Sequence, residues 1–290
     1  MDSPRQPYPQ FQSALHQLRQ VPPWALLSLV MNGLLFITIL VMLRQFSRVG
    51  DGGLSRANAF AADTYNYNAV APFDPELGQR HSLAYEQWVD LLATEARVAA
   101  ANNDPRQNIL LGDSLTLWFP TSMLPGRKTW LNQAISGENS GGLRNRLYLL
   151  DETTPEAVFI MVGINDLLWG NAEADLVYNV RMIINYLQQT HPDTRVVVQS
   201  ILPHGGEAST WEGRDRLLTI APDRIREIND QIKLVTIETG VDYLNLYPLF
   251  ATGDGYLRPD LTTDGLHLNE NGYMVWRTAL ALVNEAGLKP

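Results

Sequence analysis

The chain contains no cysteine, so neither a disulfide framework nor a thiolate metal site can form from its own 290 residues. Positive charge is scarce as well: 22 Lys and Arg stand against 31 Asp and Glu, which gives a net charge of −9 at pH 7. Because nucleic-acid binding requires basic patches that contact phosphates, nucleic acid is a poor partner for this chain. A chain of this length can bury a sizeable core without disulfides.

Motifs for metals and nucleotides are also absent. The sequence has no H-E-x-x-H pattern and no clustered histidines, and the acidic stretch 254–264 lacks the regular alternation of a calcium-binding loop. Neither the phosphate-binding pattern G-x-x-x-x-G-K-S/T nor the dinucleotide-binding pattern G-x-G-x-x-G occurs. We therefore expect no metal and no cofactor.

What the sequence does contain is four short segments that together supply the groups needed for serine acyl chemistry. In chain order they offer a serine nucleophile, a glycine amide, an asparagine amide, and a histidine base with a carboxylate three residues before it. The segments are GDSL at 112–115, SG at 136–137, GIND at 163–166 and DGLH at 264–267.

The chemistry of these residue types is consistent with one site. A serine hydroxyl is a poor nucleophile until a base removes its proton, and a histidine such as His267, with an ordinary pKa of about 6.5, suits that task at neutral pH. Asp264 can hold the imidazole by its other nitrogen and stabilise the imidazolium. Among the five histidines only His267 has a carboxylate at this spacing, whereas His16 lies in the N-terminal tail and His191 precedes a proline.

The four segments resemble the SGNH hydrolases, also called GDSL lipases and esterases, in their order and spacing over roughly residues 108–286. The resemblance implies that Ser114, Asp264 and His267 are catalytic. It also implies that the amides of Ser114 and Gly137 and the side chain of Asn165 form an oxyanion hole. Donors of this kind point at the carbonyl oxygen on which negative charge develops during ester attack.

Taken singly, each segment also has a purely structural interpretation. A Gly-Asp-Ser turn after a strand is commonly a helix cap, and the segment 163–166 suits a loop that needs a glycine, with Asp166 as a helix N-cap. The joint occurrence of the four segments favours catalysis.

The hydrophobic pattern predicts a three-layer α/β/α fold with a parallel, five-stranded, flavodoxin-like sheet, as the resemblance also implies. The first three strands end just before the segments at 112, 136 and 163, and ligands bind beyond the carboxyl ends of such strands. The nucleophile elbow of α/β-hydrolases, G-x-S-x-G, is absent because Thr116 stands where its second glycine would be. We expect strands at 108–111, 130–135, 157–162, 195–202 and 241–246, and helices at 81–100, 142–150, 172–189, 222–239 and 270–286.

A second strong feature precedes this domain. From Trp24 to Leu43 there are 20 consecutive uncharged, mostly apolar residues, and a helix of this length spans about 30 Å, the thickness of the hydrocarbon core. The run is longer than the apolar region of a secretory signal peptide and is followed by Arg44 and Arg48 rather than by a cleavage site. We predict one uncleaved N-terminal transmembrane helix.

This gives four parts: an N-terminal tail (1–20), a transmembrane anchor (21–43), a linker (44–80) and the hydrolase domain (81–290). Arginines flank the apolar run on both sides, so the positive-inside rule does not decide its orientation. Single-span anchors most often keep a short N-terminal tail inside. We therefore expect the catalytic domain on the outer, or periplasmic, side of a membrane.

The substrate is less constrained by the sequence. Trp118 and Trp169 follow two of the four segments and are candidate walls of the acyl site, with core packing as the alternative. The loop 204–218 is a candidate for substrate selection, and His204 within it is either a substrate contact or an ordinary loop residue. The oligomeric state cannot be deduced from the residues.

Three function classes remain open. The first is a membrane-anchored serine esterase that acts on acyl or acetyl esters of a lipid or carbohydrate. The second is an acyltransferase that uses the same residues to pass the acyl group to a sugar or lipid acceptor, which differs only in how water is excluded. The third is a non-catalytic binding domain on a membrane tether, against which the intact Ser114, Asp264 and His267 argue.

Overall fold

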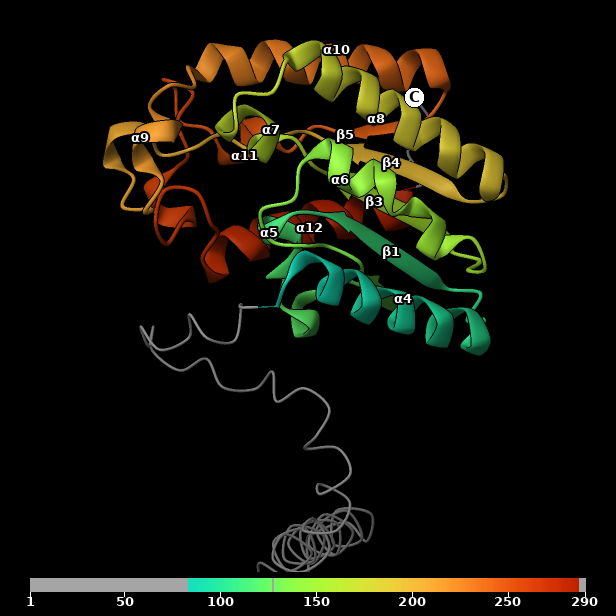
Figure 1. The fold of residues 1–290 in the computed structure, drawn as a ribbon. Helices are drawn as coiled ribbons and strands as arrows, with labels where there is room; N and C mark the ends of the chain where they lie inside the picture. Colours follow the sequence, from blue (N-terminus) through green and yellow to red (C-terminus); the bar gives the residue numbers. More distant parts are fainter. Residues whose placement is uncertain (1–82, 127, 287–290) are drawn as a thin grey trace, which may run out of the picture. The chain divides into compact units, whose positions relative to one another are not determined.

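The computed structural model describes residues 83–126 and 128–286. Five strands form one sheet, in which neighbouring strands all run parallel, in the order β2-β1-β3-β4-β5 (Figure 1). This is the flavodoxin-like strand order, and the predicted parallel five-stranded sheet is confirmed. The strands are β1 (Gln107–Gly112), β2 (Thr129–Asn132), β3 (Ala157–Met161), β4 (Arg195–Gln199) and β5 (Asp242–Leu244).

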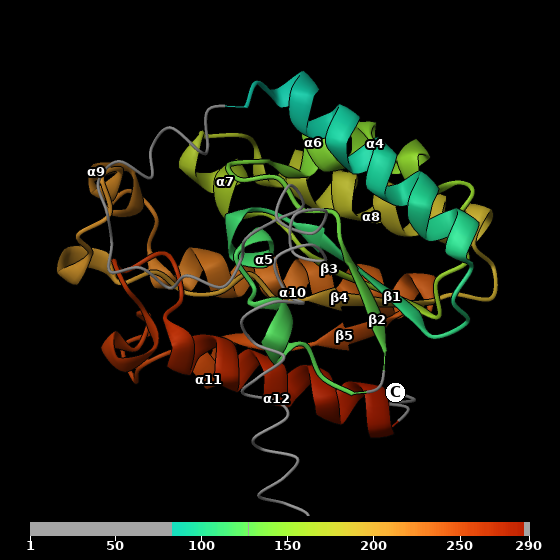
Figure 2. The same ribbon diagram turned by 90° about the horizontal axis from the view of Figure 1, so that it is seen from below.

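Helices cover both faces of this sheet (Figure 2). Among the described residues the α-helices are α4 (Tyr85–Asn102), α5 (Ser114–Leu117), α6 (Ser140–Asn145), α7 (Ile164–Leu168), α8 (Glu173–Thr190), α9 (Arg214–Leu217), α10 (Pro222–Thr239), α11 (Tyr247–Phe250) and α12 (Glu270–Ala286). In this described part of the chain, four short 3-10 helices lie in the connections: η3 (Thr121–Met123), η4 (Leu147–Leu150), η5 (Gly206–Ala208) and η6 (Pro259–Leu261).

The core is divided between the two faces by the two-residue period of the strands. In β1, Ile109 and Leu111 pack with apolar residues of α4, α8 and α10, whereas Leu110 between them packs with α12. Every residue of β1 is buried, as expected for an inner parallel strand covered on both sides. Trp276 of α12 is fully buried on the second face and donates a 2.7 Å hydrogen bond from its indole nitrogen to Gln199 Oε1.

Helices α10 and α12 have the predicted bounds and α8 is shifted by one residue, whereas α4 begins at Tyr85 and ends at Asn102 instead of spanning 81–100. Pro222 occupies the first turn of α10, and Gly240 ends that helix in the left-handed conformation, with φ of 71°. Helix α4 buries Leu92, Ala96 and Ala99, all on the face that the periodicity assigns to the core.

The predicted helix 142–150 is wrong in detail, because it divides into α6 and η4 at Arg146. Asn139 caps α6 by accepting a 2.9 Å hydrogen bond from the Gly142 amide, so the helix begins earlier than predicted. The side chain of Arg146 turns inward to pair with Glu138 instead of continuing a solvated helical face.

The predicted transmembrane segment, 24–43, and the predicted tail and linker lie outside the described residues. Within 83–126 and 128–286, no helix combines the length and apolar character needed to cross a bilayer.

Candidate active site

Ser114 begins helix α5 directly after β1, at the carboxyl edge of the sheet. Asp113 caps this helix by accepting a 3.0 Å hydrogen bond from the Leu115 amide, which fixes the turn before the serine. Position 112 requires a glycine, because any Cβ there would lie only 2.3 Å from both Met161 O and Thr116 Oγ1. The sequence Gly-Asp-Ser therefore allows a tight strand-to-helix turn with the serine at its tip.

A chain of hydrogen bonds joins Ser114, His267 and Asp264. Ser114 Oγ lies 3.1 Å from His267 Nε2, and His267 Nδ1 lies 2.8 Å from Asp264 Oδ2. These distances are within hydrogen-bond range for both contacts. The structure thus brings together a hydroxyl and an imidazole that are 153 residues apart in the sequence, in the relation of nucleophile, base and orienting carboxylate.

The Asp264 carboxylate is held for this role by its own loop. Burial alone would raise the pKa of Asp264, but hydrogen bonds from the His267 ring and from the amides of His267 and Leu266 outweigh it, so the pKa is lowered. The Asp264 carbonyl in turn accepts hydrogen bonds from the amides of Thr210 and Trp211, at 2.8 and 3.0 Å. Asp264 therefore stays ionised beside the imidazole, and the loop that follows β4 supports it.

Three donors are available for the predicted oxyanion hole. Among the described residues, the amides of Ser114 and Gly137 have no hydrogen-bond acceptor. Gly137 has φ of 76°, a conformation that favours glycine. The Asn165 side chain donates one N–H to the carbonyl of Glu138 at 3.0 Å, which places this amide beside Gly137 and leaves its second N–H for a ligand.

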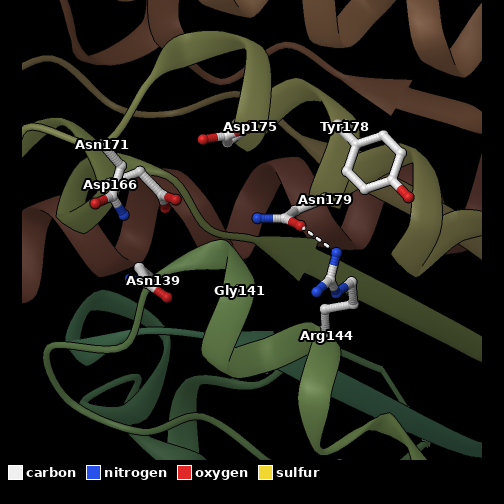
Figure 3. Close-up of a pocket in the computed structure, with 8 residues that line it drawn as sticks. All are labelled: Asn139, Gly141, Arg144, Asp166, Asn171, Asp175, Tyr178 and Asn179. Atoms are coloured by element: carbon white, nitrogen blue, oxygen red, sulfur yellow. Dashed lines mark hydrogen bonds between the residues drawn. The ribbon is translucent and has the colours of Figure 1, made fainter.

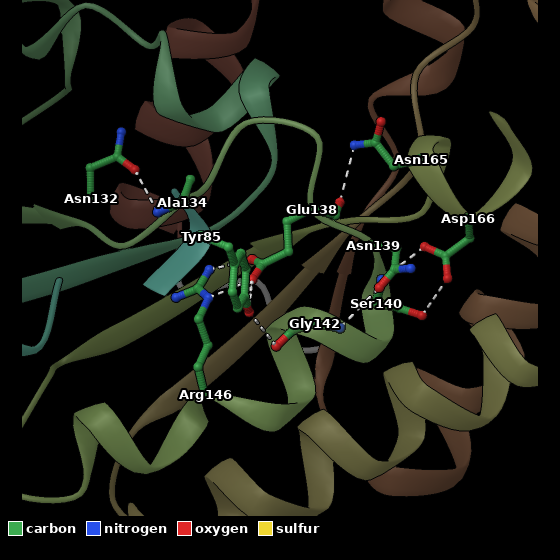
Figure 4. A network of polar contacts seen from close by, with 10 residues as sticks. All are labelled: Tyr85, Asn132, Ala134, Glu138, Asn139, Ser140, Gly142, Arg146, Asn165 and Asp166. Carbon is green, nitrogen blue, oxygen red and sulfur yellow. Dashed lines mark hydrogen bonds and ion pairs between the residues drawn. The ribbon is translucent and has the colours of Figure 1, made fainter. Parts of the chain in front are cut away.

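A buried ion pair fixes the loop that carries Gly137 (Figure 4). Glu138 and Arg146 are both buried and form two hydrogen bonds, 2.7 Å from Nε to Oε1 and 2.5 Å from Nη2 to Oε2. The Tyr85 hydroxyl donates to Glu138 Oε1 at 3.0 Å. Burial, followed by the Glu138 charge, raises the pKa of Tyr85 to about 12. Sequence reasoning missed this group because its members are distant in the chain and carry no motif.

A second contact ties the same loop to helix α7. The amide and hydroxyl of Ser140 donate to the two carboxylate oxygens of Asp166, at 2.8 and 2.6 Å (Figure 4). The sequence suggests Asp166 as a helix N-cap, but the residue before α7 is Gly163 and Asp166 instead accepts from the neighbouring loop. Because Asp166 is adjacent to Asn165, this contact fixes the position of the Asn165 backbone relative to Gly137.

The two tryptophans proposed from sequence as substrate contacts, Trp118 and Trp169, are both exposed. The Trp118 ring lies beside the His267 ring, with centroids 4.2 Å apart, and is 39% exposed. Trp169 is 60% exposed, at the end of α7. Both can meet a ligand from solvent.

His204 is different, and the predicted substrate contact is not supported. It is buried, its Nδ1 accepts a 3.0 Å hydrogen bond from the Gly206 amide, and its Nε2 lies 2.7 Å from the Ile220 carbonyl. Burial lowers the pKa of His204, against the effect of the Ile220 carbonyl, so the ring is neutral and carries its proton on Nε2. The ordinary loop interpretation is the one that fits, because both ring nitrogens are already used.

A polar cavity of about 390 Å³ lies between α6, α7 and α8 (Figure 3). Arg144 donates a 2.8 Å hydrogen bond to Asn179 Oδ1 across it. Neither Ser114 nor His267 lines this cavity, so it is separate from the hydroxyl and imidazole. Its lining residues are Asn139, Gly141, Arg144, Asp166, Asn171, Asp175, Tyr178 and Asn179.

Over the described ranges, no group of three or more His, Asp or Glu side chains is arranged to hold a metal ion.

The buried carboxyl of Asp113 predicts a pH-dependent stability. Burial raises its pKa to about 7, with a further increase from the Glu138 and Asp166 charges, although the Leu115 amide acts in the opposite direction. An unfolded aspartate has a pKa of about 3.9, so between about pH 4 and pH 7 the folded protein holds a proton that the unfolded chain has lost. The free energy of unfolding should therefore fall as the pH rises through this window and level off above it.

The Asp113→Asn variant should lose this component, because asparagine is neutral throughout and can still accept the hydrogen bond from Leu115. Urea unfolding at a series of pH values from about 5 to 8 measures it, with an expected slope of up to about 1.4 kcal/mol per pH unit in the wild type. Parallel pH profiles for the two proteins would show that Asp113 does not titrate in this way.

Comparisons with known proteins identify the family and the fold of the chain. The sequence profile of the GDSL-like lipase/acylhydrolase family matches residues 82–275. A solved structure of a candidate platelet activating factor from Streptococcus pneumoniae has a TM-score of 0.60 at 22% identity, covering 72% of this chain and 98% of that one. A GDSL-like lipase from Bacteroides thetaiotaomicron has a TM-score of 0.53 at 21% identity, covering 68% and 100%. At these identities the structures establish a shared fold. No curated protein matches the chain.

Proposed function

The chain belongs to the GDSL-like lipase/acylhydrolase family and is a hydrolase that acts on ester bonds, and from this premise we propose that it is a serine esterase that works through an acyl-enzyme on Ser114. The observation that supports this most is the hydrogen-bonded chain from Ser114 Oγ to His267 Nε2 and from His267 Nδ1 to Asp264. No metal or cofactor takes part in the proposed reaction.

In the first half-reaction, Ser114 Oγ attacks the ester carbonyl carbon while His267 Nε2 takes the hydroxyl proton. Asp264 accepts the Nδ1 hydrogen bond and stabilises the imidazolium. Collapse of the tetrahedral intermediate breaks the bond to the alcohol oxygen, and His267 returns the proton to the leaving alcohol. In the second half-reaction, His267 deprotonates a water that attacks the acyl-enzyme, which releases the carboxylic acid and restores the serine.

The negative oxygen of each tetrahedral intermediate needs donors that are already in place. We assign this role to the amides of Ser114 and Gly137 and to the free N–H of Asn165. The contact between Asn165 and the Glu138 carbonyl costs no rearrangement during the reaction, because it exists before substrate binds.

Removal of the Asn165 amide should affect the rate more than stability. Asn165→Ala is expected to lower kcat by a factor of about 10² to 10³, since one oxyanion donor is lost. Turnover of a chromogenic acetate ester measures kcat and KM, and thermal unfolding monitors the fold. Asn145, which is exposed on α6, provides the matched control, and Asn145→Ala should retain wild-type kcat. Equal kcat in both variants would remove Asn165 from the proposed site.

A fluorophosphonate probe tests the proposed nucleophile directly, because it reacts with activated serines. Mass spectrometry should find the adduct on Ser114, and a panel of p-nitrophenyl esters of increasing acyl length should then define the acyl preference. No adduct on Ser114 under conditions in which the protein is folded would contradict the proposal.

Our proposed substrates are acyl or acetyl esters of a lipid or carbohydrate. The exposed indoles of Trp118 and Trp169 offer apolar walls for the acyl group. Product analysis with an added sugar or lipid alcohol separates hydrolysis from acyl transfer. Free acid as the main product supports the esterase, and acylated acceptor as the main product would replace it with a transferase.

We also propose that residues 24–43 anchor the enzyme in a membrane, with the catalytic domain on the outer or periplasmic side. The 20-residue uncharged run supports the anchor. Alkaline carbonate should leave the full-length protein in the membrane pellet, whereas release into the supernatant would contradict the anchor. Protease added to intact cells should degrade the domain, and full protection would contradict the orientation.

A further inference from the structure

Arg216 on α9 contacts two aromatic rings but, among the described residues, its guanidinium has no hydrogen-bond or ion-pair partner. Its guanidinium carbon lies 4.4 Å from the ring centroid of Trp169 and 5.4 Å from that of Trp211, within cation–π distance of both. No carboxylate within the described ranges pairs with this guanidinium, although Glu212, in the turn before α9, and Asp215, on α9 itself, are both exposed. The arginine is thus oriented by aromatic rings and keeps its N–H donors unused.

Both aromatic residues are bonded to elements of the proposed site. Trp169 follows Asn165 by one helical turn, and its amide donates to the Asn165 carbonyl at 3.0 Å. The Trp211 amide donates to the Asp264 carbonyl at 3.0 Å. The two tryptophans that contact Arg216 are therefore hydrogen-bonded through their backbones to Asn165, assigned to the oxyanion hole, and to Asp264, which accepts from His267. Helices α5, α7 and α9 all lie toward the same end of the sheet in Figures 1 and 2.

Neighbouring Arg214 shows that this arrangement is particular to Arg216. The Arg214 guanidinium donates two hydrogen bonds to the Glu207 carbonyl, at 3.2 and 3.0 Å, and so supports the loop itself. Two arginines on one short helix therefore have different environments: one is satisfied by the backbone, and the other is held with its donors free.

On the basis of the proposed function, we propose that Arg216 binds an oxyanion, a carboxylate or phosphate, carried by the ester substrate. A guanidinium presents a planar fork of donors that matches both groups, and contact with aromatic rings reduces the conformational freedom lost on binding. In a chain of net charge −9, an unpaired arginine at the site gives local attraction for an anion that the protein as a whole repels. The substrate class is thus an ester with an acidic group, rather than a neutral ester.

Matched substrates test this binding. Acetate esters of ω-hydroxycarboxylic acids of increasing chain length are compared with their neutral primary amides and with analogues that end in a phosphate, and acetate release gives kcat and KM. At the chain length that reaches Arg216, a charged ester should have a kcat/KM about tenfold above its amide, a factor that corresponds to about 1.4 kcal/mol. The difference should lie mainly in KM.

Variants of Arg216 and Arg214 test whether Arg216 causes the preference for charged over neutral esters. The charged-to-neutral ratio should fall to about one in Arg216→Gln and be partly retained in Arg216→Lys, which keeps the charge but not the fork. Arg214→Gln removes the same charge from the same helix and should keep the wild-type ratio. The inference is overturned by a ratio near one at every chain length in the wild type. It is equally overturned if Arg216→Gln lowers both rates by one common factor, since that indicates only structural support of the loop.

A binding measurement separates this inference from the proposed function. Titration of the wild type with inorganic phosphate and with benzoate should change the tryptophan fluorescence, because Trp169 and Trp211 contact Arg216. Affinity should weaken about tenfold in Arg216→Gln and stay unchanged in Arg214→Gln. If no ester is cleaved but this pattern appears, the esterase proposal fails and the anion site stands. Identical titrations of wild type and Arg216→Gln exclude the anion site, whatever the ester assay shows.

Discussion

Replacing Ser114 with alanine is expected to lower kcat for ester hydrolysis by a factor on the order of 10⁴ to 10⁶. In the proposed mechanism this oxygen forms the acyl-enzyme, and without it His267 has no hydroxyl to deprotonate. The remaining rate would come from the oxyanion donors and from substrate binding alone. Acetate or p-nitrophenol release by concentrated enzyme measures the residual rate.

The fold should be unaffected, because the substitution removes a single oxygen atom from a small side chain at the carboxyl edge of the sheet. Near-identical urea unfolding of Ser114→Ala and the wild type would establish this. Ser122→Ala, in the exposed η3 helix nearby, is the matched control and should retain full activity. A Ser114→Ala enzyme with more than about one tenth of wild-type kcat would be incompatible with the covalent mechanism.

The second large effect concerns stability. Glu138→Ala should lower the free energy of unfolding by about 3–5 kcal/mol, because it leaves the Arg146 guanidinium buried without its carboxylate. The side chains of this pair are 1% and 4% exposed, so water cannot replace the missing partner. Urea or thermal unfolding measures the loss. The Tyr85 phenol offers a second reading, since its pKa should fall from about 12 once the neighbouring charge is removed.

An exposed ion pair provides the control for this prediction. Arg181 and Glu238 join α8 to α10 with side chains 38% and 58% exposed, and Glu238→Ala should cost less than about 1 kcal/mol. The double variant Glu138→Met, Arg146→Met should recover most of the stability lost in Glu138→Ala, because the uncompensated charge is then gone. Equal losses for Glu138→Ala and Glu238→Ala would show that the buried pair is not the important contact.

The sequence predicts the parts of this protein that follow a local rule. Apolar runs that end in Gly-Asp-Ser and Gly-Ile-Asn locate two strand ends. Pro222 and Gly240 predict both ends of α10 without error. The spacing of Asp264 and His267 suffices to predict their contact, because the three-residue interval closes a short loop.

Other features could not be predicted because their partners are distant in the chain. Glu138 meets Tyr85 across 53 residues, and nothing in either local sequence favours the other. His204 resembles a site residue because it follows a strand. Its ring nitrogen Nε2 is instead hydrogen-bonded to the Ile220 carbonyl, 16 residues away, and no local pattern predicts this contact. Arg214 and Arg216 have nearly the same sequence context, and only the positions of Glu207, Trp169 and Trp211 distinguish them.

The hydrogen bond between Ser114 and His267 joins the first strand of the sheet to the loop before α12, and the Tyr273 hydroxyl of α12 donates to the Leu115 carbonyl at 3.0 Å. During synthesis, Ser114, the proposed nucleophile, leaves the ribosome long before His267, its proposed base. If the proposed mechanism holds, an unfinished chain carries an unactivated serine, and ester cleavage should begin only when α12 docks. Onset of turnover in a refolding experiment would accordingly report completion of the whole domain.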